Sequence, residues 1–303
     1  MPTISNDFSI QLVEKSSLEQ VNWEKLEFGK TFSDHMFLME YSNGEWHSGK
    51  IMPFQEIPMH PAMSALHYGQ SIFEGLKAYR LEDGAMALFR PEANAQRFNA
   101  SARRMAMAEL PEELFIESCR QLVQIDRDWF PNVEGGSIYL RPFMIASEAF
   151  LGVKPSSEYL YMVIASAAGG YFKSGAPAVS LWVSQDYSRA APGGTGAAKC
   201  GGNYASSLIA QAEAMKLGHD QVVFLDAAEN RWIEELGGMN IFFVFEDGSI
   251  QTPPLSGTIL PGITRNSLLT IARDEGLTVR EERYAIDQWE ADAKSGRIVE
   301  SFA

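Results

Sequence analysis

A single lysine, Lys199, lies between two glycine clusters in the segment 193–204, which reads GGTGAAKCGGNY. Glycines remove side-chain bulk and let the backbone approach a ligand closely. A lysine in such a loop suits two tasks, because its ammonium can clamp a phosphate and its neutral amine can attack a carbonyl. The residue types alone leave both tasks open, together with a third interpretation, a solvent-exposed lysine in a flexible loop.

Common motifs do not account for this loop. A dinucleotide-binding G-x-G-x-x-G would need glycine at position 199, and a P-loop needs Gly-Lys-Ser/Thr where the chain has Ala-Lys-Cys. The five histidines, at positions 35, 47, 60, 67 and 219, show no metal-ligand spacing. Imine formation with a carbonyl, most often the aldehyde of pyridoxal phosphate, is the remaining chemistry that uses a lysine in this way.

The elements around the loop follow from periodicity and turn residues. A strand is expected at 179–184, a helix at 206–217 closed by Gly218, and strands at 221–225, 231–235 and 240–245. Asp247-Gly248 predicts a two-residue hairpin turn, and a last helix should run from near Thr264 to before Gly276. These elements would hold the lysine in a mixed α/β domain.

The first half of the chain predicts a second set of elements. Asn43-Gly44 indicates a hairpin turn, and strands are expected at 138–145 and 160–164. Pro91 should open a helix that places Phe98, Ala102 and Met105 on one face and stops at Pro111. The small-residue stretch 167–178 suits an interdomain linker. The fold class expected is α/β, or mixed α+β.

Composition limits the class of partner and the compartment. The 303 residues suffice for two domains, and the formal net charge of -14 argues against a nucleic-acid partner. Two cysteines without a C-x-x-C pattern favour a reducing compartment. No secretory signal is visible, and the longest apolar run, 159–168, predicts a buried strand rather than a membrane span. A cytoplasmic location is expected.

The motifs together resemble those of the branched-chain amino-acid aminotransferases, pyridoxal-phosphate enzymes of fold type IV. They occur in that family's order, and the resemblance extends from about residue 25 to the last residue. The matching segments are LHYGQSIFEGLKAYR (66–80), LFRPEANAQRF (88–98), IYLRPF (138–143), FLGVKP (150–155), GGTGAAKCGGNYASSL (193–208), GGMNIFF (237–243) and LPGITR (260–265).

The resemblance implies an organisation for the whole chain. A small N-terminal α/β domain would span 1–168, a linker 169–178, and a PLP-binding domain with a pseudo-barrel 179–303, with the active site in the cleft between the domains. It also implies a homodimer or higher homo-oligomer. The family's sequence normally continues beyond the position of Ala303 into a Gly-Thr-Ala turn, so a C-terminally shortened domain with weak or no activity is expected. Gly238, where some members have threonine, is a smaller departure.

The resemblance also assigns roles around the cofactor. Lys199 matches the lysine that forms the Schiff base and then moves a proton, which needs a largely neutral amine. Tyr204 matches the tyrosine that hydrogen-bonds the cofactor's phenolic oxygen. Glu235, rather than the neighbouring Glu234, matches the carboxylate that faces the pyridine nitrogen. The phosphate would be held by Arg97 and by the helix start at Ile263 and Thr264, although Thr264 could equally be an N-cap alone.

The substrate side follows in the same way. Tyr139 and Arg141 lie two apart on a predicted strand, so they share a face, and the resemblance assigns that face to the substrate carboxylate. Tyr68 and Phe73 would form aromatic walls of the side-chain pocket, with ordinary core packing as the alternative. Leu151 and Val153 would reach towards the partner subunit.

The reaction implied is transfer of the amino group of leucine, isoleucine or valine to 2-oxoglutarate, giving the branched 2-oxo acid and glutamate. The kinetics would be ping-pong. Two alternatives remain beside this expectation. One is another fold-type-IV enzyme, a D-amino-acid transaminase or an aminodeoxychorismate lyase, against which K-x-G-G-N-Y and Y-L-R-P argue. The other is a non-catalytic fragment.

Overall fold

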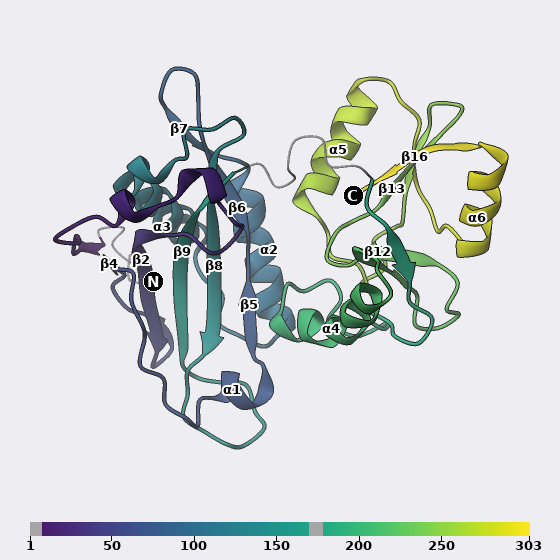
Figure 1. Cartoon of the computed structure of the whole chain (residues 1–303). Coiled ribbons are helices and arrows are strands. Elements are labelled where there is room, and N and C mark those ends of the chain that lie inside the picture. Colours follow the sequence, from purple (N-terminus) through teal and green to yellow (C-terminus); the bar gives the residue numbers. More distant parts are fainter. Residues whose placement is uncertain (1–7, 170–177) are drawn as a thin grey trace. The chain divides into compact units, whose positions relative to one another are not determined.

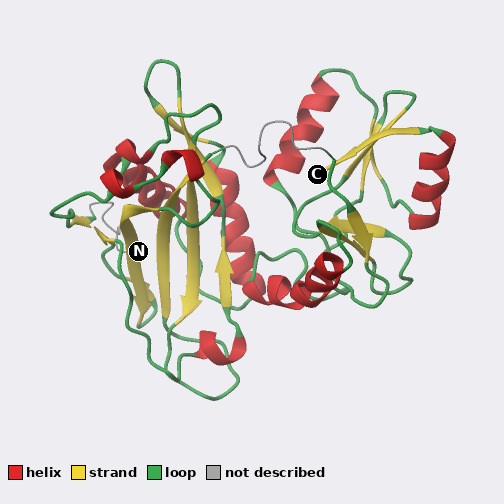
Figure 2. Ribbon diagram, viewed as in Figure 1, coloured by secondary structure: helices red, strands yellow, loops and turns green. Residues whose placement is uncertain are grey.

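The computed structural model describes residues 8–169 and 178–303 (Figure 1). Contacts within the chain divide it into two compact units, Met1–Ala176 and Pro177–Ala303. Of the predicted linker at 169–178, residues 170–177 lie outside the described residues. Both units mix helices with strands, so the predicted fold class is confirmed (Figure 2).

The first unit is built on a nine-stranded sheet among its described residues. The strand order is β1-β4-β2-β9-β8-β6-β7, with β3 beside β2 and β5 beside β8. The strands are β1 (Ser9–Ile10), β2 (Phe32–Ser42), β3 (Glu45–Trp46), β4 (Lys50–Pro53), β5 (Ser71–Phe73), β6 (Leu76–Arg80), β7 (Met86–Leu88), β8 (Ser137–Ala146) and β9 (Tyr159–Ala168).

Helices cover one face of this sheet. The unit contains α1 (Ser64–Tyr68), α2 (Pro91–Arg104), α3 (Glu112–Ile125) and the 3₁₀ turns η1 (Leu18–Gln20), η2 (Trp23–Lys25) and η3 (Arg127–Trp129). Helix α3 packs against β2, β8 and β9, and α2 packs against α3. Tyr161 of β9 contacts the rings of Phe98 and Phe115 with centroids 5.6 and 6.3 Å apart. These buried aromatic rings join both helices to the sheet.

Strand β8 therefore presents two different faces. It pairs antiparallel with β9 over its whole length, and Met144 lies opposite Tyr161, on the side of the helices. Side chains alternate along a strand, so Leu140 shares that side and is fully buried. Tyr139 and Arg141 point to the other side and are only partly buried. The helices thus fix the sheet, while its opposite face carries Tyr139 and Arg141 as well as an apolar cluster around Met162.

The second unit contains two smaller sheets among its described residues, with orders β10-β11-β12 and β15-β14-β13-β16. Strand β11 buries Val223 and Leu225 towards the other sheet and Val222 and Phe224 towards α4. The elements are β10 (Leu181–Val183), α4 (Gly201–Lys216), β11 (Gln221–Leu225), β12 (Ile233–Leu236), β13 (Phe242–Phe245), β14 (Ile250–Thr252), α5 (Ile263–Asp274), β15 (Val279–Glu281), α6 (Ile286–Ser295) and β16 (Ile298–Phe302).

Several predicted elements are present at or near their predicted positions. Asn43 and Gly44 have positive φ angles of 55° and 84° and join β2 to β3 as a two-residue turn. The predicted strand at 138–145 corresponds to β8 and the strand at 160–164 to the longer β9. Gly218, with a φ of 85°, follows α4 as predicted. These signals are local, which is why the sequence reveals them.

Four predictions about helices and turns were wrong. Helix α2 ends at Arg104, because Ala106 adopts a φ of 52° and Met107 N–H donates to Ala102. Pro111 instead precedes α3, which the sequence did not indicate. Helix α4 begins five residues before the predicted start and includes two glycines. The turn after β13 contains three residues, 246–248, and a further helix, α6, follows α5.

Candidate active site

Lys199 and Tyr204 meet at the start of α4. The Nζ of Lys199 lies 2.8 Å from the Tyr204 hydroxyl and 5.1 Å from the centre of its ring. The chain turns into the helix at Cys200, which brings residues five apart in sequence into contact. Ala198 and Cys200 on either side are 2% and 1% exposed. Buried neighbours therefore hold the lysine backbone while its side chain reaches the phenol.

The glycine loop is fixed by hydrogen bonds from Asn203. Its amide nitrogen donates to the carbonyl oxygens of Thr195 and Ala198, each at 2.8 Å. The backbone of Gly196 packs so closely against Thr258 that an added Cβ would lie 2.3 Å from the Thr258 carbonyl oxygen. Glycine at 196 is thus needed for close packing of two backbone segments.

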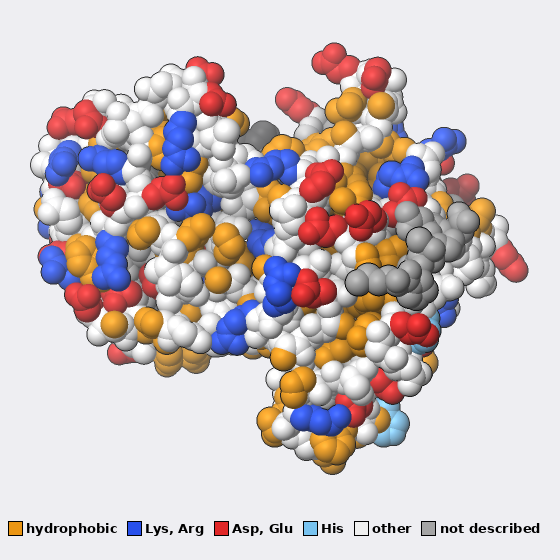
Figure 3. Space-filling view, turned by 180° about the vertical axis from the view of Figure 1, so that it is seen from behind, with side chains coloured by type: hydrophobic (Ala, Val, Ile, Leu, Met, Phe, Trp, Pro, Cys, Tyr) orange, Lys and Arg blue, Asp and Glu red, His pale blue; other side chains and the backbone are white. Residues whose placement is uncertain are grey.

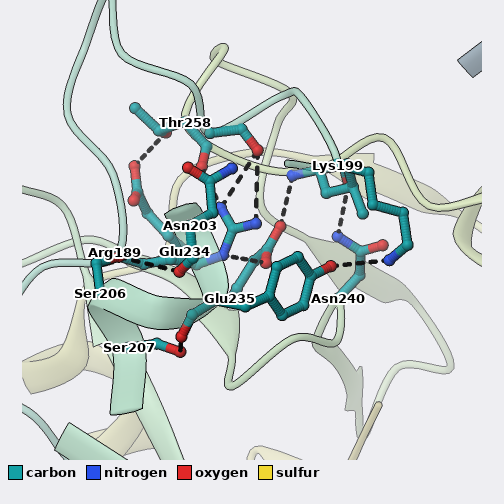
Figure 4. A network of polar contacts seen from close by, with 12 residues as sticks. Arg189, Lys199, Asn203, Ser206, Ser207, Glu234, Glu235, Asn240 and Thr258 are labelled. Atoms are coloured by element: carbon teal, nitrogen blue, oxygen red, sulfur yellow. Dashed lines mark hydrogen bonds and ion pairs between the residues drawn. The ribbon is translucent and has the colours of Figure 1, made fainter. Parts of the chain in front are cut away.

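Glu235 lies on β12 and is 1% exposed. Its Oε1 accepts a hydrogen bond from Leu260 N–H at 2.5 Å, and its Oε2 lies 2.8 Å from the Nε of Arg189. Burial raises the pKa of this carboxyl to about 7, although Arg189, the Leu260 N–H and Lys199 act in the opposite direction. Figure 4 shows this network of polar contacts.

The neighbouring Glu234 has a different partner. It accepts a hydrogen bond from the Thr258 hydroxyl at 2.5 Å, as Figure 4 shows. Burial raises the pKa of the Glu234 carboxyl as well. Adjacent residues of a strand point to opposite sides, which agrees with their separate partners. The positive charge of Lys199 lowers the pKa of Glu235, so electrostatics link this carboxyl group to the lysine.

Ile263 and Thr264 are the first two residues of α5, as predicted. The N-cap is Gly262, which has no side chain to cap the helix, so Thr264 is not the N-cap. A helix start without a side-chain cap presents backbone N–H groups and a partial positive charge, which suit an anion such as a phosphate. The segment before the helix also supplies the N–H of Leu260 to Glu235.

Tyr139, Arg141 and Phe73 form a second cluster, within the first unit. A guanidinium N–H of Arg141 donates to the Tyr139 hydroxyl at 2.9 Å, and the guanidinium lies 4.8 Å from the centre of the Phe73 ring. An added Cβ at Gly75 would lie 2.1 Å from the Tyr139 hydroxyl. The buried Nε of Arg141 has no hydrogen-bond partner among the described residues. An unpaired buried N–H favours an acceptor brought by a ligand.

Arg97 lies on α2 and forms a two-pronged ion pair with Glu74. Its Nε and one terminal nitrogen each lie 2.7 Å from an oxygen of that carboxylate, which is fully buried. Asn94 donates to the same carboxylate at 2.7 Å. The pair fixes the direction of the guanidinium, and Glu74 is a residue that the sequence did not single out.

The predicted residues thus fall into two groups, one in each unit, and each group is described within its own unit. Tyr68 belongs to the first unit, where its hydroxyl donates to the carbonyl of Leu151. The first group is Tyr68, Phe73, Arg97, Tyr139 and Arg141, and the second is Lys199, Tyr204, Glu235, Ile263 and Thr264. Their functional roles stay predictions.

Arg189, Asn203 and Thr258 are contributors that sequence reasoning missed. Asn203 belongs to the G-G-N-Y motif and could have been noticed as a polar residue at a helix start. Arg189 and Thr258 show no pattern, because their partners are distant in sequence.

Within the part of the chain that the structure describes, no helix combines the length and apolarity needed to cross a bilayer.

The fold and the lysine–phenol–carboxylate arrangement agree with the comparison to known families. The model of the amino-transferase class IV family matches residues 71–294, and the chain therefore belongs to this family. Class IV aminotransferases use pyridoxal phosphate. The fold class, the family and the cofactor expected from the sequence are confirmed.

Similar proteins narrow the comparison further. The branched-chain-amino-acid aminotransferase of Mycolicibacterium smegmatis is 56% identical over 281 residues, which cover 91% of this chain and 76% of that protein. Branched-chain-amino-acid transaminase 1 of Bacillus subtilis is 47% identical over 94% of this chain and 80% of its own length. The solved Escherichia coli branched-chain amino acid aminotransferase has a TM-score of 0.71 at 29% identity, covering 89% of this chain and 82% of that one.

The residues of the second unit fit pyridoxal phosphate. The cofactor needs an amine for its aldehyde, a donor for its phenolic oxygen, a carboxylate for its ring nitrogen and an anion site for its phosphate. Lys199, Tyr204, Glu235 and the start of α5 are groups of these kinds. The raised pKa of Glu235 shows that burial disfavours its charged form, which a cationic neighbour such as a protonated ring nitrogen would stabilise.

Proposed function

We propose that this chain transfers the amino group of leucine, isoleucine or valine to 2-oxoglutarate, in two half-reactions of a ping-pong cycle. The observation that carries the proposal is the 2.8 Å contact between the Lys199 amine and the Tyr204 hydroxyl, in the unit that also holds the buried Glu235. The names of relatives 45–56% identical over most of the chain support the substrate class. They also favour it over the D-amino-acid transaminase and lyase alternatives.

Lys199 carries the proton transfer in this proposal. Bound pyridoxal phosphate supplies an aldehyde that exchanges amines and a ring that accepts electron density. The neutral Lys199 amine removes the proton from the substrate's Cα as a general base and later returns a proton as a general acid. Tyr204 orients the amine through the 2.8 Å hydrogen bond. Glu235, as a carboxylate, supplies the negative charge for the protonated ring nitrogen.

The remaining predicted residues bind and orient. Arg97 and the N–H groups at Ile263 and Thr264 hold the phosphate. Arg141 and Tyr139 bind the substrate carboxylate, for which the unpaired Nε of Arg141 is a suitable donor. Phe73 and Tyr68 line the pocket for the branched side chain.

The proposal includes a homodimer in the cytoplasm. Leu151 and Val153, which are 62% and 87% exposed, are the residues proposed to reach the partner subunit. Figure 3, seen from behind, shows orange apolar side chains at the lower tip of the first unit, around α1 and the loop 147–157. Exposed apolar side chains that gather at one place are typical of an interaction surface.

One labelling experiment tests the site assignment. The protein is incubated with pyridoxal phosphate, reduced with borohydride and digested, and the modified peptide is mapped by mass spectrometry. We expect the label on Lys199 and its loss in Lys199→Ala, while Lys216→Ala, at the far end of α4, should keep it. Labelling elsewhere would refute the assignment. Labelling at Lys199 without turnover of leucine and 2-oxoglutarate would refute the proposed substrates alone.

A further inference from the structure

Arg189 lies behind the carboxylate that the proposed function assigns to the cofactor. It is 6% exposed and follows β10 in the chain. Its Nε lies 2.8 Å from Glu235 Oε2, and one terminal nitrogen donates to the Thr258 carbonyl oxygen at 2.7 Å. The same guanidinium contacts the Gly196 carbonyl oxygen at 3.4 and 3.5 Å. One side chain thus joins β12, the glycine loop and the segment before α5.

The carboxylate retains acceptor sites beyond these contacts. A carboxylate offers about four lone-pair positions on its two oxygens. Leu260 N–H takes one position on Oε1, whereas Oε2 lies in an ion pair with Arg189 and has no hydrogen-bond partner among the described residues. Arg189 therefore supports Glu235 from one side without using all of its capacity. The arrangement suits a carboxylate that must also receive a cationic N–H donor.

The electrostatics point to the same role. Glu235 is 1% exposed, and burial without a partner disfavours the charged form of a carboxyl group. Burial is the strongest influence on the Glu235 pKa, and among the influences that lower it Arg189 is the largest. An arginine remains charged at any ordinary pH, so its effect persists throughout the working range. Removing it would leave the Glu235 carboxyl predominantly neutral near pH 7.

Arg189 also ties the carboxylate to the lysine. Gly196 lies three residues before Lys199, and Thr258 lies two residues before Leu260, which donates to Glu235. The guanidinium accordingly fixes the backbone of both segments at once. Its fork of donors at fixed angles can do this, whereas the single ammonium of a lysine cannot reach all three partners in the same geometry.

We propose that Arg189 is a positioning residue for the transamination, which holds Glu235 as a carboxylate and fixes it relative to the loop that carries Lys199. The role of Glu235 rests on the proposed function, whereas the role of Arg189 rests on its contacts with Glu235, Gly196 and Thr258. Arg189 acts through Glu235 and the loop, and the proposal gives it no contact with substrate.

The test measures pyridoxal phosphate affinity of the purified full chain, by fluorescence, between pH 6 and 9. In the wild-type protein the affinity should weaken as pH falls and Glu235 takes up a proton, and Glu235→Gln should remove the part of that dependence that Glu235 causes. In Arg189→Gln the midpoint should move up by about one pH unit, so the dissociation constant at pH 7 rises about fivefold. Arg189→Lys keeps the charge and should leave the midpoint near that of the wild type.

Arg280→Gln provides the matched control. Arg280 is another arginine of the second unit, and it is half-buried, but its guanidinium packs on Phe245 and donates to Ser249. Its loss should lower stability without moving the midpoint. An unchanged midpoint in Arg189→Gln would overturn the proposal, and so would an equal shift in Arg280→Gln.

A second variant covers the case in which Arg189→Gln does not fold. The double variant Arg189→Gln/Glu235→Gln removes both charges, and it should recover soluble protein if the unpaired carboxylate is the cause. Failure of the double variant to fold would contradict that cause. Absence of any cofactor binding by the wild-type protein would instead refute the proposed function, so the two failures are distinguishable.

Discussion

The side chain of Lys199 interacts with one residue nearby in the sequence, Tyr204, and with the charge of one distant residue, Glu235. Tyr204 is five residues away, and the Lys199–Tyr204 hydrogen bond of 2.8 Å follows from the turn into α4. The electrostatic link with Glu235 depends instead on how β12 packs behind the loop. The hydrogen bond and the electrostatic interaction can be altered by separate substitutions, which allows the contribution of each to the reaction rate to be measured.

Substitution of the lysine should remove the proton-transfer group. Lys199→Ala should lower the rate of transamination of leucine by at least 10²–10⁴-fold, roughly the contribution of a positioned general acid or base. Tyr204→Phe keeps the ring and removes the hydroxyl, and it should lower the rate only about tenfold, roughly the value of one hydrogen bond. A coupled assay of glutamate formation measures both. Equal losses in the two variants would contradict the separate roles.

Glu235 should make the stability of the cofactor-free protein depend on pH. Its pKa is raised from 4.5 to about 7 in the folded chain, so between these values the unfolded chain releases the proton first. The free energy of unfolding therefore falls as pH rises from about 4.5 to 7. Glu235→Gln should reduce this fall by on the order of 3 kcal/mol. Urea unfolding at pH 5 and pH 8 measures it.

The control for this pH dependence is Glu300→Gln, which changes an exposed carboxylate on β16. It should leave the difference in unfolding free energy between the two pH values unchanged. If the free energy of unfolding of Glu235→Gln falls between pH 5 and pH 8 by as much as that of the wild-type protein, Glu235 does not titrate in this range.

At the scale of elements, close backbone packing positions the glycine loop. A Cβ at position 196 would meet the Thr258 carbonyl oxygen, a backbone atom that cannot rotate away. Gly196→Ala should destabilise the second unit by about 1–3 kcal/mol, as overpacking does. Thermal unfolding measures the loss. Gly169→Ala, where nothing lies within 4 Å, is the control and should change little.

The strand β8 and the connection between β5 and β6 position the substrate-facing cluster. In Gly75→Ala the new methyl group would overlap the Tyr139 hydroxyl and separate it from Arg141. We expect the KM for leucine to rise about tenfold, the value of one lost charge-assisted hydrogen bond, with a smaller effect on kcat. Steady-state kinetics measure the effects on KM and on kcat separately. An unchanged KM would remove Tyr139 from substrate recognition.

At the scale of the whole molecule, the proposed dimer makes a further prediction. Val153 is 87% exposed in a loop with other exposed apolar side chains. Val153→Asp would place a charge in the proposed interface, where desolvation is costly, and should shift the protein from dimer to monomer. Sedimentation velocity measures the change. A wild-type protein that sediments as a monomer at micromolar concentration would refute the proposed dimer.

Short-range signals account for what the sequence alone determined about this protein. The ordered motifs identified the family, and the pattern of 138–145 predicted a strand with Tyr139 and Arg141 on one face, which corresponds to β8. The positive φ angles of Asn43, Gly44 and Gly218 are properties of single residues and turns. Each signal lies within a few neighbouring residues, so no knowledge of distant contacts is needed to read it.

Tertiary structure alone decided the features that depend on distant residues. The chain folds back at Ala106 and begins α3 after Pro111, where the sequence predicted only the end of a helix. Adjacent glutamates at 234 and 235 look equivalent in sequence, yet one reaches Thr258 and the other reaches Arg189 and Leu260. Packing brings these partners together because burial of a carboxylate is favourable only where donors surround it.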